Sequence, residues 1–98
     1  MHLRKQKVER ELLIQLLRSG TSIGANVEEA IGAQSKNDFI SKISIAYKES
    51  RETSYWLRLL KDAEIMEIKL SSSFLLDSEE LKKILSSILK TSKGLSRN

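Results

Sequence analysis

The run RSGTSIGANVEEA at residues 18–30, followed by QSKNDF at residues 34–39, carries the strongest structural signal in this chain. Its two glycines, two serines, threonine and asparagine are typical of a loop. Strong helix formers flank the run on both sides, and its apolar residues keep a helical spacing. The run therefore has two interpretations: a loop that binds a ligand, or a helix that packs closely against a neighbour.

The apolar spacing favours a helix from about residue 5 to residue 33. A phosphate-binding loop would need a different glycine spacing, a following lysine and a preceding strand, and none of these is present. Gly20 and Gly24 are four residues apart and fall on one helix face. Each costs about 1 kcal/mol relative to alanine inside a helix. We therefore expect a neighbouring backbone to approach closely at Gly20 and Gly24, with Ser22 and Ala25 extending the small-residue surface.

The rest of the chain predicts two further helices. Ser35 is a good N-cap, and Asp38 three residues later completes a variant of the capping box. We expect the second helix over about residues 36–63 and the third over about residues 68–93. A seven-residue spacing in the third segment is typical of a bundle seam; it connects Phe74, Leu81, Ile88 and Leu95. The chain contains no proline. It is predicted to be one all-α domain over residues 1–98, an antiparallel up-and-down bundle of three long helices.

Several kinds of site are disfavoured by composition. The chain has no cysteine and a single histidine, His2, so we expect no transition-metal site and no activated nucleophile. Glu49 and Glu52 lie one turn apart, but pairing with basic side chains is a better interpretation than metal binding. We expect no enzyme, no cofactor and no small-molecule substrate. No apolar run is long enough to span a membrane and no signal peptide is visible, which predicts a cytoplasmic protein.

The formal net charge of +4 is compatible with a polyanionic partner. Solvated helix faces are the alternative explanation for the same basic residues. Trp56 is expected to pack in the core or an interface, with base stacking as the lesser alternative. The basic residues placed best for contacts to RNA or DNA phosphates are Arg4, Lys5, Lys7, Arg10, Arg51, Arg58 and Lys61.

Five blocks occur in the order of a known family: residues 18–30, 34–43, 46–49, 52–57 and 80–85. They resemble the bacterial four-helix-bundle proteins encoded by intervening sequences in large-subunit ribosomal RNA genes. That family is similar to the accessory variability determinant of diversity-generating retroelements. The resemblance implies a ring-shaped homopentamer, a basic surface for nucleic acid and no enzymatic activity. By comparison with that family, we expect the first helix to be missing or much shortened in this chain, and Glu64 stands near a position where the family usually has glycine.

These observations favour a non-enzymatic, self-associating helical bundle that binds RNA or DNA through basic side chains. The alternative is a protein-interaction or scaffold module without nucleic-acid binding. In that alternative, the small-residue face or an exposed groove would receive a partner helix. A missing helix would uncover an apolar face of several hundred Å², which is typical of an interaction surface.

Overall fold

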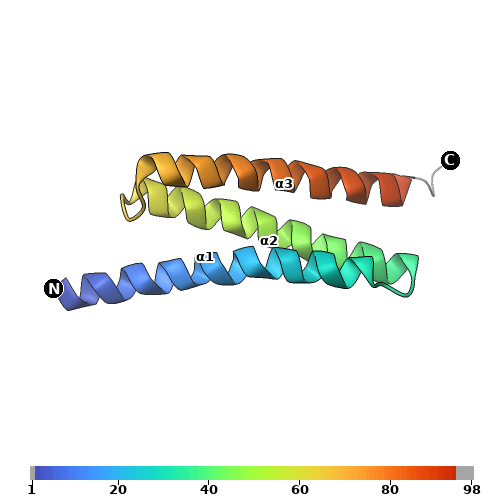
Figure 1. Ribbon diagram of the computed structural model, residues 1–98, viewed down its shortest axis with the longest axis horizontal. Coiled ribbons are helices and arrows are strands. Elements are labelled where there is room, and N and C mark those ends of the chain that lie inside the picture. The colour runs from blue at the N-terminus through green and yellow to red at the C-terminus, as the bar shows by residue number, and fades with distance from the viewer. Residues whose placement is uncertain (1, 95–98) are drawn as a thin grey trace.

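The computed structural model describes residues 2–94, and within that range it consists of three long helices and two short connections. Helix α1 spans His2–Ile31, α2 spans Lys36–Asp62 and α3 spans Ile68–Gly94. Consecutive helices run antiparallel (Figure 1). The all-α class is confirmed, and each helix end lies within three residues of its expected position. Leu95, the last residue of the predicted seam, lies outside the described residues.

Helix α2 is the centre of an open layer. Both α1 and α3 pack against α2, whereas no Cα atom of α1 comes within 8 Å of a Cα atom of α3 in the described part of the chain. The molecule is elongated, with extents of 58 × 22 × 16 Å. Its radius of gyration is 16.0 Å, compared with about 12.6 Å for a compact domain of this length. The layer therefore has an open side between α1 and α3.

The first helix continues without a break through the glycine-rich run, as the apolar spacing predicts. The close packing expected at its glycines does not occur within the chain. A Cβ atom built on Gly20 or Gly24 would meet nothing within 4 Å, and Gly24 and Ala25 are exposed. Ser22 is half-buried, and its Oγ and carbonyl oxygen accept hydrogen bonds from the side-chain amide of Asn26 in the same helix. The predicted packing motif is therefore wrong for the contacts inside this chain.

Small hydroxyl residues, rather than glycines, mediate the close contacts of α2 with its neighbours. Thr53 Oγ1 donates to Ser19 Oγ of α1 at 2.9 Å. Ser54 Oγ lies 2.7 Å from Ser78 Oγ of α3. Thr53 is also bonded to the Glu49 carbonyl oxygen of its own helix, so its buried hydroxyl group is satisfied. Because these side chains are short, the backbones of α1 and α3 can come close to the backbone of α2. The hydrogen bonds between them favour this arrangement of the three helices.

The apolar core lies where α2 meets its two neighbours. One buried cluster draws on all three helices and contains Ile23, Ala30, Ile43, Ala46 and Leu85, and Leu57 and Leu60 of α2 are also buried. Half-buried residues pack around them, including Phe39, Tyr47 and Leu81. Among the buried residues of this cluster, Leu85 is the one that α3 contributes in the described part of the chain.

The two helix connections are defined by local backbone chemistry. Ser35 is the N-cap of α2, and its side chain accepts a hydrogen bond from the Asp38 backbone N–H at 3.0 Å. At the other end of α2, Glu64 N–H bonds to the Lys61 carbonyl oxygen and Ile65 N–H to that of Leu60. This pair of bonds is a Schellman motif. Glu64 adopts a left-handed φ of 59°, which explains why a glycine suits this position.

Candidate functional surfaces

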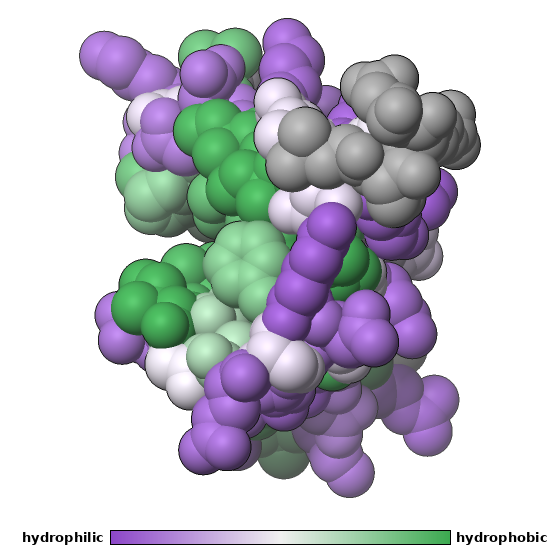
Figure 2. Space-filling view, turned by 90° about the vertical axis from the view of Figure 1, so that its right-hand side faces the viewer, coloured by the Kyte–Doolittle hydropathy of each residue, from purple (hydrophilic) through white to green (hydrophobic). Residues whose placement is uncertain are grey.

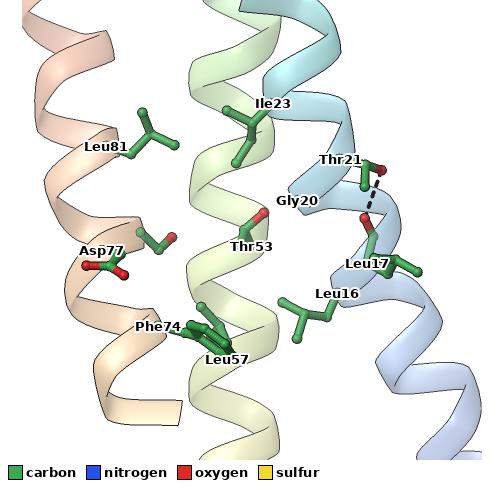
Figure 3. A pocket seen from close by; sticks show the side chains of 11 residues that line it. Leu16, Leu17, Gly20, Thr21, Ile23, Thr53, Leu57, Phe74, Asp77 and Leu81 are labelled. Carbon is green, nitrogen blue, oxygen red and sulfur yellow. Dashed lines mark hydrogen bonds between the residues drawn. The ribbon is translucent and has the colours of Figure 1, made fainter. Parts of the chain in front are cut away.

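An apolar groove runs along the open side of the layer, between α1 and α3 and above α2 (Figure 3). The cavity has a volume of about 350 Å³. Leucine and isoleucine side chains of α1 form one wall and Phe74 and Leu81 of α3 form the other, with Leu57 of α2 as the floor. Among the described residues, Asp77 is the only charged one that lines the groove. Its chemistry suits an apolar occupant.

On α1 and α2, Arg18 lies between two carboxylates. Its Nη1 lies 3.0 Å from Glu49 Oε2, and its Nη2 pairs with Glu52. Glu52 also accepts a hydrogen bond from Trp56 Nε1 at 3.1 Å. The predicted pairing of Glu49 and Glu52 with a basic residue of a neighbouring helix is confirmed. Trp56 is half-buried and packs edge-on against Tyr55, with ring centroids 5.0 Å apart. This network cross-links the two helices.

The hydrogen bonds from Trp56 and Arg18 lower the pKa of Glu52 below its ordinary value. A carboxylate with a lowered folded-state pKa stabilises the fold above its unfolded-state pKa, about 4.3 for glutamate, and this contribution is lost as the pH falls further. We expect Glu52→Gln to flatten the acid dependence of the unfolding free energy below about pH 4.3. Urea titrations at a series of pH values measure this dependence.

The matched control is Glu80→Gln, which removes an exposed carboxylate without an ion pair in the described range. This variant should keep the wild-type acid dependence. An equal flattening by both substitutions would contradict the role given to the Trp56 and Arg18 contacts.

The basic residues predicted from the sequence do not form one cluster. Arg4 and Lys5 lie beside the turn that joins α2 to α3, where they line a shallow hollow with Glu64. Lys7 and Arg10 are exposed on the same helix. Three predicted residues belong to α2: Arg51 is exposed, Arg58 lies 4.0 Å from a Glu79 carboxylate oxygen, and Lys61 lines a hollow against α3.

The α2–α3 contact carries a second basic region that the sequence analysis does not single out. Tyr47 of α2 and the C-terminal half of α3 line two adjoining hollows, the first with a volume of about 380 Å³. No residue of these hollows lines the apolar groove. We call this region the lysine face; it contains Lys82, Lys83, Lys90 and Lys93 with Ser86 and Ser87.

A sequence signal for the lysine face exists. Residues 81–94 contain four lysines and neither aspartate nor glutamate, whereas the N-terminal cluster is interrupted by Glu9 and followed by Glu11. Lys82 Nζ is paired with Glu79 Oε1 at 2.9 Å. This bond and a hydrogen bond from Ser54 lower the pKa of Glu79.

Figure 2 views the molecule from the end at which α3 finishes. Hydrophobic side chains gather on one side there, and hydrophilic side chains cover much of the other.

The described residues form neither a metal-binding cluster nor a membrane-spanning helix. Between residues 2 and 94, no group of three or more histidine, aspartate or glutamate side chains is arranged to hold a metal ion. None of the three helices combines the length and hydropathy that a membrane span requires.

Both the sequence and the fold of this chain are similar to those of known proteins. The sequence model of the 23S rRNA-intervening sequence proteins matches residues 2–87. The chain is also similar to a solved protein of unknown function from the S23 ribosomal protein family of Bacteroides thetaiotaomicron VPI-5482. The two are 52% identical with a TM-score of 0.78, and the match covers 81% of this chain and 73% of that one. No curated protein matches the chain.

Proposed function

Because this chain belongs to the 23S rRNA-intervening sequence protein family, we propose that it is a non-enzymatic, self-associating helical bundle that binds nucleic acid. The contacts are made by lysine and arginine side chains with backbone phosphates of RNA or duplex DNA. A composition without cysteine and with a single histidine supports the non-enzymatic role, because it provides neither a thiolate nucleophile nor more than one imidazole base to activate a serine.

The lysine face is the observation that supports the binding proposal most directly. Lys83 and Lys90 are seven residues apart, about two helical turns, so they project from the same side of α3. Both are exposed. The hydroxyl groups of Ser86 and Ser87 lie between them and are suitable donors to phosphate oxygens. Arg58 and Lys61 extend the positive charge along the same α2–α3 contact.

Binding of this kind depends on charge rather than on base sequence. Each phosphate neutralised by a lysine releases condensed counterions, so the affinity falls steeply with salt. Phosphate contacts fix the position of the protein but do not read bases. We therefore expect weak sequence preference.

The test is a fluorescence-anisotropy titration of the full chain against a structured RNA and a duplex DNA. Binding to at least one of them should be measurable at about 50 mM salt and should fall by an order of magnitude or more by about 200 mM. Absence of binding to both at about 50 mM salt, where electrostatic attraction is near its strongest, would contradict the proposal.

The apolar groove favours a second candidate function, a protein-interaction module. Its lining of leucine, isoleucine and phenylalanine is suited to the apolar face of a helix. A defined protein partner that stays bound after nuclease treatment would favour this second candidate over nucleic-acid binding.

A further inference from the structure

Three hydroxyl groups of the lysine face, those of Tyr47, Ser86 and Ser87, have no hydrogen-bond partner among the described residues. All three reach solvent. Elsewhere in the bundle, helix hydroxyl groups are used within the chain. Ser50 and Ser71, for example, donate to carbonyl oxygens of their own helices at 2.6 and 2.9 Å. The first hollow of the lysine face therefore presents three hydroxyl groups, from two helices, that are available to a ligand.

Two lysines that line this hollow also have unpaired charges. Lys83 and Lys90 form no ion pair between residues 2 and 94, whereas Lys82 is paired with Glu79. Seven residues separate Lys83 from Lys90, which is about 10.5 Å along a helix axis. The hollow has a volume of about 380 Å³. Pockets of about 300–1,000 Å³ bind small organic groups, so the hollow is large enough for a nucleobase.

Tyr47 places an aromatic ring where the two hollows meet. Tyr47, Ser86 and Lys90 line both hollows, so the hollows adjoin at these residues. The Tyr47 side chain packs against the apolar core and is half-buried. Contact with the core restricts the ring, and its open part faces the hollows. An aromatic ring held beside positive charges is typical of surfaces on which bases of a single strand stack.

We infer that the lysine face binds a single-stranded nucleic acid, with an unpaired base against Tyr47 and neighbouring phosphates on Lys83 and Lys90. The inference rests on the proposed function and specifies the class of nucleic acid that the site binds. The bases of a duplex are paired and stacked with one another, so they cannot enter a hollow. An unpaired base can turn outward and stack on an aromatic side chain. Single-stranded DNA, single-stranded RNA and the loops of a folded RNA share this chemistry.

The groups around the hollow select for strand structure rather than for base identity. Every base has a π-face, so stacking on Tyr47 is open to all four bases. The hydroxyl groups of Ser86 and Ser87 both donate and accept, and they therefore suit phosphate oxygens as well as different base edges. We expect strong dependence on an unpaired base together with weak sequence preference.

Anisotropy titrations against matched oligonucleotides test this inference. The probes are a mixed-sequence single-stranded RNA, the DNA strand of the same sequence, and the duplex of each with its complement, all at about 50 mM salt. Tyr47→Leu should weaken binding to at least one single strand by about 5–150-fold, the loss that corresponds to one base–aromatic stack. Its affinity for the duplexes should change less than twofold. A loss with RNA alone would identify RNA as the ligand, and a loss with both strands would extend the site to DNA.

Two further variants separate stacking from folding. Tyr47→Phe keeps the aromatic ring and should weaken single-strand binding less than Tyr47→Leu does. The matched control is Tyr55→Leu, because Tyr55 is also on α2, is 50% exposed and lines neither hollow. This control should bind all four probes as the wild-type chain does. Circular dichroism of each variant measures whether the helices persist.

A second measurement requires no substitution in the protein. A single strand that keeps its phosphates but has no bases should bind the wild-type chain about 5–150-fold more weakly than the complete strand. Equal binding of these two strands would overturn the inference, as would equal losses on single strands and duplexes for Tyr47→Leu. Either result would leave the proposed nucleic-acid binding intact. Absence of binding to every probe would instead contradict the proposed function and the inference together.

Discussion

Replacing Leu85 by alanine should lower the free energy of unfolding by about 2–5 kcal/mol. Leu85 is 2% exposed and is the α3 member of the apolar core. Its truncation removes apolar contacts and leaves a cavity that the helices fill only in part. A small domain is stable by about 5–15 kcal/mol in total, so this single change should move the urea midpoint strongly. Urea unfolding monitored by circular dichroism measures the effect.

The control for this prediction is on the same helix. Leu76 is 73% exposed, so Leu76→Ala removes the same atoms without opening a cavity and should change stability by no more than about 0.5 kcal/mol. Similar losses for Leu85→Ala and Leu76→Ala would show that the contact between α3 and α2 does not depend on Leu85.

The double substitution Lys83→Gln with Lys90→Gln should weaken nucleic-acid binding about 100-fold at about 50 mM salt. If each lysine neutralises one phosphate of duplex DNA, the slope of log affinity against log salt should become shallower by about 1.8. Glutamine keeps the length and helix propensity of the side chain close to those of lysine, so the fold should persist. Anisotropy titrations at several salt concentrations give both quantities.

A matched double substitution separates the two basic regions. Lys5→Gln with Lys7→Gln removes the same charge from α1, where the neighbouring glutamates already reduce the local positive potential. We expect a smaller loss of affinity for this variant. A larger loss would place the principal phosphate contacts on α1 and contradict the assignment to the lysine face.

Helix positions were predictable because their signals are local. Ser35 caps α2 through a bond to a residue three positions away, and such a bond depends on the immediate sequence alone. The position of the turn after α2 follows from the predicted helix bounds, about 36–63 and 68–93, whereas the way in which the helix ends was not predicted. Glu64 adopts the left-handed conformation of a C-terminal cap without being glycine, and no composition rule selects it.

The choice between two helix faces was not predictable from α1 alone. The stripe around Ser19 and Ile23 and the stripe around Gly20 and Gly24 differ by one residue, and both have helical spacing. Only the partner decides which of them is buried, and that partner is α2, with Thr53 opposite Ser19. The lysine face was missed for a similar reason. Residues 81–94 contain four lysines and no acidic residue, but this pattern alone does not distinguish a solvated helix face from lysines that line a hollow with Tyr47.

The central position of α2 has a consequence for how the chain folds. In the described residues, every close approach between helix backbones joins helices that are consecutive in sequence, since α1 meets α2 and α2 meets α3. The chain thus consists of two helical hairpins that have α2 in common. Each hairpin can form its own interhelical contacts without the other. Proteins rich in such local contacts fold rapidly, because little chain entropy is lost before contacts form. Folding can begin at either connection, and α2 is the template on which the second hairpin is completed.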